Sequence, residues 1–270
     1  MTLGAGRIRA LLDDHGIAPS RALGQNFLID PNTARRIAAA SGAGDGDRVL
    51  EIGPGLGSLT LALSELGAWV TAVELDRHLV PVLTEVVADA DPPVRVVHAD
   101  ALEVDLDDLV PHGRRCRLAA NLPYNVGTTI FLRILEEAPA VSGGVVLVQR
   151  EVAERLAARA GDGAYGIPSV KAAWWVQAKV AGKVPASVFH PRPRVDSAFV
   201  TFERHDPPGD DALRARAFAL VDAGFGQRRK MLRRSLADHV PSGALEAAGI
   251  DPTRRAEELA LDDWVRLARG

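Results

Sequence analysis

The residues Asn121, Leu122, Pro123 and Tyr124 follow a short apolar run and have the types needed to hold a flat amine. The Asn121 side chain carries a carbonyl that accepts hydrogen bonds, and Pro123, with its fixed φ, helps to hold the backbone carbonyl of Leu122 in place. Tyr124 offers an aromatic face for stacking. A strand that ends in a turn explains the same residues, since Asn and Pro are ordinary loop residues.

Three glycines, Gly53, Gly55 and Gly57, follow the first predicted strand and lie at the start of a predicted helix. Glycine lets the backbone approach a ligand closely, and the start of a helix offers free N–H groups. The dinucleotide pattern G-x-G-x-x-G would need a glycine at position 58, where the chain has Ser58. The G-x-G-x-G spacing suits a nucleotide without a pyrophosphate, such as S-adenosylmethionine. A structural turn explains these glycines as well.

Two carboxylates follow the next two predicted strands. Glu74 ends the second strand, 21 residues after Gly53, where an acid is expected to bind the two ribose hydroxyls of a nucleotide. Asp100 ends the third strand and offers an acceptor to an adenine amino group. Each carboxylate also fits a helix N-cap. Because the glycine turn, Glu74, Asp100 and Asn121 fall at the ends of four successive strands, where α/β sheets bind ligands, the sequence predicts a cofactor cleft.

The elements that must position these residues alternate along the chain. Strands are predicted over residues 48–53, 69–75, 94–100, 117–124 and 143–150, and helices over 57–67, 77–89, 129–137 and 151–160. The strands are too apolar to have a face in water, which favours a parallel sheet covered by helices on both sides. The expected fold class is therefore α/β, with a Rossmann-like sheet.

The pattern changes after about residue 187. A proline-rich turn and one alternating strand lead into a linker, and the following segment has a helical pattern with breaks at Gly224 and Gly226. We therefore expect residues 1–207 to form the α/β domain and residues 208–270 to form a small C-terminal helical domain.

The composition excludes several classes of protein. The chain has 270 residues, of which 47% are hydrophobic and 25% are charged, as in a soluble globular protein. Its single cysteine, Cys116, excludes an internal disulfide framework and a multi-cysteine metal site. Because the chain has neither an apolar run of membrane-spanning length nor the apolar core of a secretory signal, we expect a cytoplasmic protein without a membrane segment.

The net charge of −3 hides an asymmetry along the chain. Residues 51–150 contain 7 Lys and Arg against 14 Asp and Glu, a difference of −7, whereas residues 151–234 contain 15 against 9, a difference of +6. The later part is therefore basic and fits a polyanionic partner, although a solvated surface explains the same charges.

Six motifs occur in an order that resembles one known family. They are LGQNFLID (23–30), LEIGPGLGSLT (50–60), VELD (73–76), NLPYNV (121–126), VFHPRPRVDSAF (188–199) and FGQRRKMLRRSL (225–236). They are similar to the motifs of the bacterial 16S rRNA adenine N6,N6-dimethyltransferases, which modify two adjacent adenosines in the last hairpin of small-subunit rRNA. The resemblance covers nearly the whole chain. The glycine motif alone indicates only a methyltransferase, NLPY narrows this to amino-group methylation, and the first and last motifs make the resemblance specific.

The resemblance implies an S-adenosylmethionine-dependent methyltransferase sheet and assigns residues to the cofactor. They are Asn26, Leu28, Gly53, Gly55, Glu74, Asp100 and Asn121, and the N-terminal segment 1–30 is expected to fold over the cofactor. Without the resemblance, residues 25–30 are a loop that enters a helix near Pro31, with Asp30 as its N-cap. One departure is Gly127, where the family commonly has Ser or Thr, and it leaves the shape of this loop open.

For the reaction, the resemblance supports Asn121, Leu122, Pro123 and Tyr124 as an amine clamp. The two carbonyls would bind the N–H groups of adenine N6 and direct its lone pair at the methyl group, and no metal is expected. The base must leave its stack to enter such a pocket. Tyr124 would form one wall and Phe189 the other, although a core phenylalanine at a strand end is the alternative for Phe189.

A basic segment near the C-terminus is assigned to RNA. Its charged residues are Arg228, Arg229, Lys230, Arg233 and Arg234, which we expect on one helix, where positions 229, 230, 233 and 234 can share a face that neutralises phosphates. A solvated face is the alternative. The expected partner is 16S rRNA within an immature 30S subunit, bound by the helical domain, and we expect a monomer.

The expected function is transfer of four methyl groups from S-adenosylmethionine to two adjacent adenosines of 16S rRNA during 30S biogenesis. The alternatives are a 23S rRNA adenine methyltransferase of the antibiotic-resistance type, a non-catalytic nucleic-acid-binding factor on the same scaffold, and a nicotinamide-dependent oxidoreductase. The FGQRRKMLRRSL motif argues against the first, and the intact cofactor and NLPY motifs argue against the second. The glycine spacing argues against the third.

Overall fold

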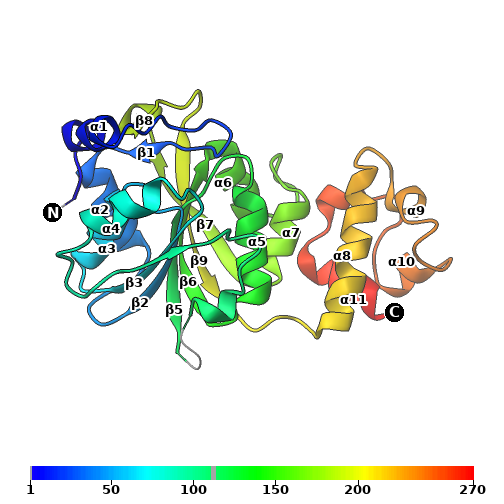
Figure 1. Cartoon of the computed structure of the whole chain (residues 1–270). Coiled ribbons are helices and arrows are strands. Elements are labelled where there is room, and N and C mark those ends of the chain that lie inside the picture. Colours follow the sequence, from blue (N-terminus) through cyan, green and yellow to red (C-terminus); the bar gives the residue numbers. More distant parts are fainter. Residues whose placement is uncertain (1, 111–113) are drawn as a thin grey trace. The chain divides into compact units, whose positions relative to one another are not determined.

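The computed structural model of the chain describes residues 2–110 and 114–270 (Figure 1). Its main sheet has seven strands in the order β4-β3-β2-β5-β6-β9-β7. Their bounds are β2 Arg48–Ile52, β3 Trp69–Glu74, β4 Arg95–His98, β5 Cys116–Asn121, β6 Val141–Gln149, β7 Val176–Val184 and β9 Ser197–Arg204. A second sheet pairs β1, Phe27–Leu28, with β8, Phe189–His190, in antiparallel orientation.

The strands β2 to β6 pair in parallel, as their apolar sequences predict. Strand β9 pairs antiparallel with β6, an orientation that its sequence does not reveal. Strand β7 at the edge of the sheet was not predicted. Only its end residues Val176 and Val184 are buried, and its middle contains Lys179 and Gly182, which are residue types depleted in strands.

The helices predicted between the strands are present, with bounds that differ from the prediction by a few residues. The helices are α1 Ala5–Asp14, α2 Pro31–Ala40, α3 Ser58–Ser64, α4 Leu79–Val86, α5 Gly127–Glu137, α6 Arg150–Ala157, α7 Ile167–Ala173, α8 Asp211–Gly226, α9 Leu232–Ser235, α10 Ala244–Ala247 and α11 Leu261–Arg269, with short 3₁₀ turns at Leu106–Asp108, Ala186–Val188 and Ala256–Glu258. Helix α2 begins as predicted, because the Asp30 side chain accepts a hydrogen bond from the Thr33 N–H at 2.8 Å.

The helices cover both faces of the main sheet (Figure 1). Buried residues of α1 to α4, among them Ile8 and Ile37, form one core with strand residues such as Val49. Helix α5 packs on the other face, where the rings of Phe131 and Phe202 of β9 meet edge to face at 5.0 Å between centroids. Coverage of both faces explains why the central strands carry so few polar residues.

The chain divides into two compact units. Unit 1 contains the residues up to Ala153 together with Lys179–Arg204, and unit 2 contains Glu154–Ala178 together with His205–Gly270. The segment Glu154–Ala178 groups with the C-terminal helices because its Trp174 shares a hydrophobic core with Trp264, and both side chains are fully buried. The predicted boundary at residue 207 lies close to the junction at Arg204 but does not include this earlier segment, and the functional division at 207 stays a prediction.

The prediction that the basic segment forms one helix is wrong. Helix α8 ends at Gly226, and Arg228, Arg229 and Lys230 lie in the turn that follows it. Only Arg233 and Arg234 are helical, in the four-residue α9. The physical reason is tertiary, because the N–H groups of Leu232 and Arg233 donate to the carbonyls of Arg254 and Pro252 and not to a preceding helical turn.

Within residues 2–110 and 114–270, no helix combines the length and the apolar character needed to cross a membrane. The same residues contain no group of three or more His, Cys, Asp or Glu side chains arranged to hold a metal ion. Cys116 is buried, and burial raises the pKa of its thiol to about 12, so it is a packing residue.

We predict that Gly144→Ala destabilises the sheet. Gly144 of β6 has φ of +152°, and an added methyl group would overlap the backbone of Leu118 on β5. The free energy of unfolding, measured by urea denaturation, should fall by about 3 kcal/mol. In the control Gly163→Ala the added Cβ would meet nothing within 4 Å, and stability should be unchanged. Equal stability of the two variants would contradict the prediction.

Candidate active site

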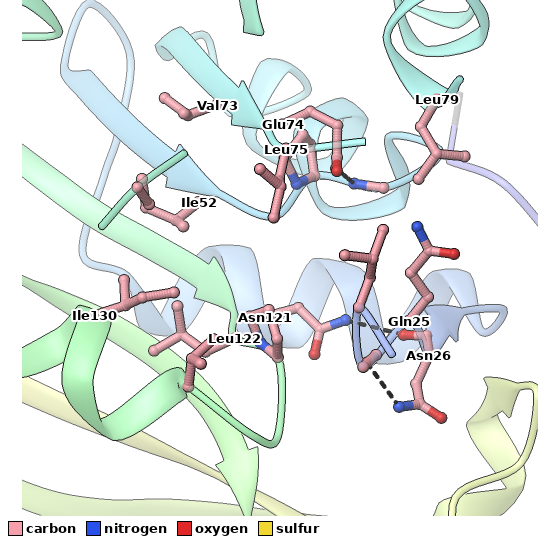
Figure 2. Close-up of a pocket in the computed structure, with 18 of the residues that line it drawn as sticks. Gln25, Asn26, Ile52, Val73, Glu74, Leu75, Leu79, Asn121, Leu122 and Ile130 are labelled. Carbon is pink, nitrogen blue, oxygen red and sulfur yellow. Dashed lines mark hydrogen bonds between the residues drawn. The ribbon is translucent and has the colours of Figure 1, made fainter. Parts of the chain in front are cut away.

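A pocket in unit 1 lies at the carboxyl ends of β2, β3, β4 and β5 (Figure 2). With the exception of Phe189, its lining includes every residue that the sequence assigns to the cofactor, to the amine clamp or to the walls around the base: Asn26, Leu28, Gly53, Gly55, Glu74, Asp100, Asn121, Leu122, Pro123 and Tyr124. The fold therefore gathers around one pocket residues that are up to 98 positions apart, from 26 to 124.

The glycine turn after β2 needs glycine for two reasons. Gly53, Gly55 and Gly57 have φ angles of +71°, +58° and +93°, in the left-handed region that favours glycine. A Cβ on Gly55 would lie 3.0 Å from the Phe27 ring, and one on Gly53 would lie 3.2 Å from the Asn121 carbonyl oxygen. The turn is therefore both sharply bent and closely approached by β5 and by the N-terminal segment.

Glu74 ties the glycine turn to the end of β3. Its two carboxylate oxygens accept hydrogen bonds from the N–H groups of Gly55 at 3.0 Å and Asp76 at 2.9 Å. Burial raises the pKa of Glu74, and the backbone donors at Asp76 and Gly55 oppose this rise. Each carboxylate oxygen has two lone pairs, so Glu74 retains acceptor capacity toward the pocket.

Asp100 lies two residues after β4. Like Glu74, it accepts a backbone hydrogen bond and also lines the pocket. Its Oδ1 accepts a hydrogen bond from the Leu102 N–H at 2.8 Å, which closes a local turn. The same side chain lines the pocket together with Ala99 and Ala101. No helix directly follows Asp100 among the described residues, so it is not a helix N-cap; it closes a turn and also lines the pocket.

The amide of Asn121 is oriented by the backbone of the N-terminal segment. Its Nδ2 donates to the carbonyl of Asn26 at 3.1 Å, and because a backbone carbonyl only accepts, this contact requires the NH₂ group on that side (Figure 2). Among the described residues no donor contacts Asn121 Oδ1 or the Leu122 carbonyl oxygen. Two acceptors from consecutive residues are thus available at the pocket.

The segment Ala22–Leu28, which we call the strap, lines one side of the pocket and is held at several points. Gln25 Nε2 donates to Asp76 Oδ2 at 2.7 Å, at the end of β3. Asn125 Nδ2 donates to the Ala22 carbonyl at 3.3 Å, and Ser58 Oγ at the start of α3 donates to the Leu28 carbonyl at 2.6 Å. These contacts connect the strap to β3, to the NLPY loop and to the glycine turn.

Part of the predicted N-terminal cover does not line the pocket. Helix α1 buries Ile8, Leu11 and Leu12 in the core of unit 1, and the lining begins at Ala22. The strap therefore supplies the pocket contacts of the segment 1–30.

The two aromatic residues predicted to stack on a base have different surroundings. Tyr124 lines the pocket and is held by a 2.6 Å hydrogen bond between its hydroxyl and Ser197 Oγ, while burial raises the pKa of Tyr124. Phe189 is 2% exposed, pairs with Leu28 and belongs to the core of unit 1. Its burial favours the alternative of a core phenylalanine, and its stacking role stays a prediction.

Sequence reasoning missed four residues that position the site. Gln25, Ser58, Asp76 and Ser197 make the hydrogen bonds that hold the strap and Tyr124. All four lie inside the six motifs, so the available signal was a polar residue within a motif that also holds assigned residues. Nothing in the spacing indicates which partner each polar residue meets.

The residues assigned to RNA are exposed in unit 2. They are Arg228, Arg229, Lys230, Arg233 and Arg234. Arg228 is engaged, because its guanidinium pairs with Glu257 at 2.8 Å and contacts the Gly163 carbonyl.

Glu51 is a buried titratable residue beside the site. It precedes Gly53 by two positions, is fully buried, and neither carboxylate oxygen has a hydrogen-bond partner of normal geometry among the described residues. Burial raises the pKa of Glu51 to about 8; the nearby Thr60 hydroxyl lowers it and the Glu74 carboxylate raises it. Glu51 is therefore mostly protonated at neutral pH.

A mostly parallel sheet with a glycine turn after β2 and carboxylates after β3 and β4 defines the class of Rossmann-like methyltransferases. The sequence profile of the family named ribosomal RNA adenine dimethylase matches residues 19–269, and the chain belongs to this family. The expected fold class and the resemblance are confirmed, and the protein is a methyltransferase of ribosomal RNA. Family membership also decides against a nicotinamide-dependent oxidoreductase.

Several proteins with curated names are similar over nearly the whole chain. A protein of Leifsonia xyli subsp. xyli named ribosomal RNA small subunit methyltransferase A is 52% identical, and the alignment covers 98% of this chain and 97% of that protein. A protein of the same name from Thermobifida fusca is 47% identical and covers 97% and 93% of the two chains.

Two solved structures are also similar. The 23S rRNA methyltransferase ErmE has a TM-score of 0.70 at 28% identity, covering 90% of this chain and 98% of that one. A dimethyladenosine transferase from Plasmodium falciparum has a TM-score of 0.75 at 22% identity, covering 89% and 95%, which supports the fold alone.

We predict that Glu51 makes stability depend on pH. Unfolded Glu51 ionises near 4.5 whereas the folded carboxyl keeps its proton up to about 8, so its contribution is complete below pH 4.5 and is lost between these values. Over that window the free energy of unfolding should fall by about 1.4 kcal/mol per pH unit relative to Glu51→Gln. Urea denaturation of both proteins at several pH values measures this difference. Parallel pH profiles would contradict it.

Proposed function

We propose that this protein transfers four methyl groups from S-adenosylmethionine to N6 of two adjacent adenosines in the 3′-terminal hairpin of 16S rRNA, within immature 30S subunits. The observation that carries the proposal is the pair of free acceptors, Asn121 Oδ1 and the Leu122 carbonyl, at a pocket that also holds the glycine turn. The small-subunit target is supported by the names of the relatives at 47% and 52% identity.

The residues present fit the proposed cofactor. Asn26, Leu28, Gly53, Gly55, Glu74, Asp100 and Asn121 would hold it. Left-handed glycines leave room for a nucleoside beside the backbone, and the lining has two carboxylates, Glu74 and Asp100, but no Lys, Arg or His among the described residues, which suits a cationic ligand. When bound, S-adenosylmethionine would supply a methyl group on a positively charged sulfur, which keeps the electron pair of the broken bond.

The clamp acts on the nucleophile. The lone pair of adenine N6 is delocalised into the ring, so the amine must be turned before it can attack. Asn121 Oδ1 and the Leu122 carbonyl would each accept one N–H of this amine, which aligns its lone pair with the methyl group. The nitrogen supplies the electrons of the new C–N bond and then loses a proton to solvent. The rate gain on this account comes from positioning and desolvation, and the chemistry requires no metal.

The remaining assignments concern the RNA. Tyr124, held by Ser197, would stack on the flipped base. The exposed charges Arg228, Arg229, Lys230, Arg233 and Arg234 of unit 2 would contact phosphates with little sequence preference. We propose that the protein acts as a monomer in the cytoplasm, where immature ribosomal subunits are found.

A large-subunit target is the second candidate. It is supported by the similarity to ErmE, whose name specifies 23S rRNA and whose structure matches over 98% of its length. The identity of 28% to ErmE against 52% to the protein of Leifsonia xyli favours the small subunit.

We predict that labelled methyl groups are transferred to unmethylated small ribosomal subunits and not to naked large-subunit rRNA. The label should appear as dimethyladenosine, since a monomethylated N6 keeps one N–H that Asn121 Oδ1 or the Leu122 carbonyl can accept. Both substrates are incubated in parallel with the protein and labelled S-adenosylmethionine. Label in the large-subunit RNA alone would indicate a 23S rRNA methyltransferase of the antibiotic-resistance type. Binding to the substrates without methyl transfer to either of them would support a non-catalytic factor.

We predict that Asn121→Ala lowers kcat by about 10²–10³-fold, because one of the two acceptors at the reacting amine is lost. RNA binding should be retained. Asn125→Ala is the matched control, since Asn125 also lines the pocket and donates to the strap at Ala22. Single-turnover methyl transfer and filter binding measure the two effects. A similar loss of kcat in both variants, or a joint loss of binding and transfer in Asn121→Ala, would count against the clamp.

A further inference from the structure

Three exposed arginines of unit 1 lie on segments that border the pocket but do not line it. Arg21 directly precedes the strap, and Arg192 and Arg194 lie in the loop between β8 and β9. Among the described residues, no ion pair or side-chain hydrogen bond engages any of these three guanidinium groups. Three such exposed cations on an acidic chain are available to a polyanionic ligand.

The loop that carries Arg192 and Arg194 is anchored to the pocket at both ends. At its start, His190 pairs with Phe27 of the strap, and the two short strands lie side by side (Figure 1). At its end, Ser197 Oγ shares a 2.6 Å hydrogen bond with the hydroxyl of Tyr124. Phe27 and Tyr124 both line the pocket.

The chain geometry keeps these arginines near residues that line the pocket. Arg192 is two residues from His190 and Arg194 is three from Ser197, so at ~3.5 Å per residue their backbones lie within about 7 and 11 Å of these anchors. Because β1 and β8 are antiparallel, the chain that leaves β8 runs back toward the side from which the strap enters β1. Arg21 lies at that side, one residue before Ala22, which lines the pocket.

Two acids on or beside these segments accept hydrogen bonds from other donors. Asp196, the single acid of the loop, accepts a hydrogen bond from the Ala186 N–H at 3.0 Å. Asp76 accepts from Gln25 and from the His78 N–H. The arginines therefore keep their charge available to a ligand.

We propose that Arg21, Arg192 and Arg194 form a phosphate-binding rim that holds the RNA backbone on either side of the base that enters the pocket. This inference rests on the proposed function, because it needs an RNA substrate with one extruded base. The pocket lining has two carboxylates and no cationic side chain among the described residues, so it repels phosphate. The base must therefore enter while its flanking phosphates stay outside, and the rim supplies the charge at that point.

The test compares salt dependence of RNA binding in full-length proteins. The probe is an RNA hairpin with two adjacent adenosines in its loop, and its dissociation constant is measured over a range of KCl concentrations. The variant is Arg192→Gln with Arg194→Gln. The control is Arg114→Gln with Arg115→Gln, which removes the same charge from exposed residues before β5, at the opposite end of the strand from Asn121.

The rim predicts a smaller salt slope. Each lost contact to single-stranded RNA should reduce the slope of log Kd against log salt by about 0.7, or about 1.4 for two contacts, which corresponds to about 25-fold weaker binding at 0.1 M salt. Arg21→Gln should reduce the slope by about half as much. Arg192→Lys with Arg194→Lys should restore the slope, and the affinity for S-adenosylmethionine should not change in any variant.

Two results would overturn the rim. One is a slope equal to that of the control pair in variants whose thermal unfolding matches the wild type. The other is a loss of S-adenosylmethionine affinity with an unchanged RNA slope, which would mean that the arginines bind the carboxylate of the cofactor. A failure of the proposed function is measured separately. If the wild-type protein transfers no methyl groups to small subunits, the proposed function fails, but the salt slope of RNA binding still tests the rim.

Discussion

The site depends on the register in which β2, β3 and β5 pair with one another. Ile52 lies opposite Val73 on one side and Ala120 on the other, so the three strands end within one residue of the same level. The next residues, Gly53, Glu74 and Asn121, therefore lie together at one edge of the sheet. Since side chains alternate along a strand, a shift of one residue in any of these pairs would turn Glu74 or Asn121 away from the pocket. The apolar cores on both faces of the sheet are what hold this register.

The strap adds a second condition, because it orients the side-chain amide of Asn121. The Asn26 carbonyl dictates which end of the Asn121 amide faces the pocket, and the strap is itself held by Asp76 and Ser58. A ligand that contacts the strap and one that contacts Asn121 therefore act on the same hydrogen bond. Under the proposed function, this links the binding of the cofactor to the preparation of the acceptor for the amine.

The sequence predicted the structural features that depend on neighbouring residues in the chain. It did not predict the features that depend on tertiary contacts. The Asp30 cap and the left-handed glycines follow from residue type alone, and the parallel strands follow from their apolar runs. The break at Gly226 was predicted from its glycine, whereas the path of the basic segment beyond it depends on carbonyls of residues 252 and 254, far along the chain. The burial of Phe189 depends on its pairing with Leu28, and the same letters would suit an exposed turn. Residue types thus predicted which side chains line one pocket better than how distant segments hold them.

Under the proposed function, the charge of the pocket lining affects how the cofactor is exchanged between successive methyl transfers. Glu74 and Asp100 are the charged residues of the lining among the residues that the structure describes, and both are acids. With the proposed cofactor, each transfer converts a positively charged sulfur into a neutral thioether, so the attraction to these carboxylates weakens as the reaction proceeds. The spent cofactor is then held less tightly than a fresh one, which favours exchange between successive transfers. The same negative lining that favours a cation excludes phosphate, so the RNA backbone must be held outside the pocket while only the neutral base enters.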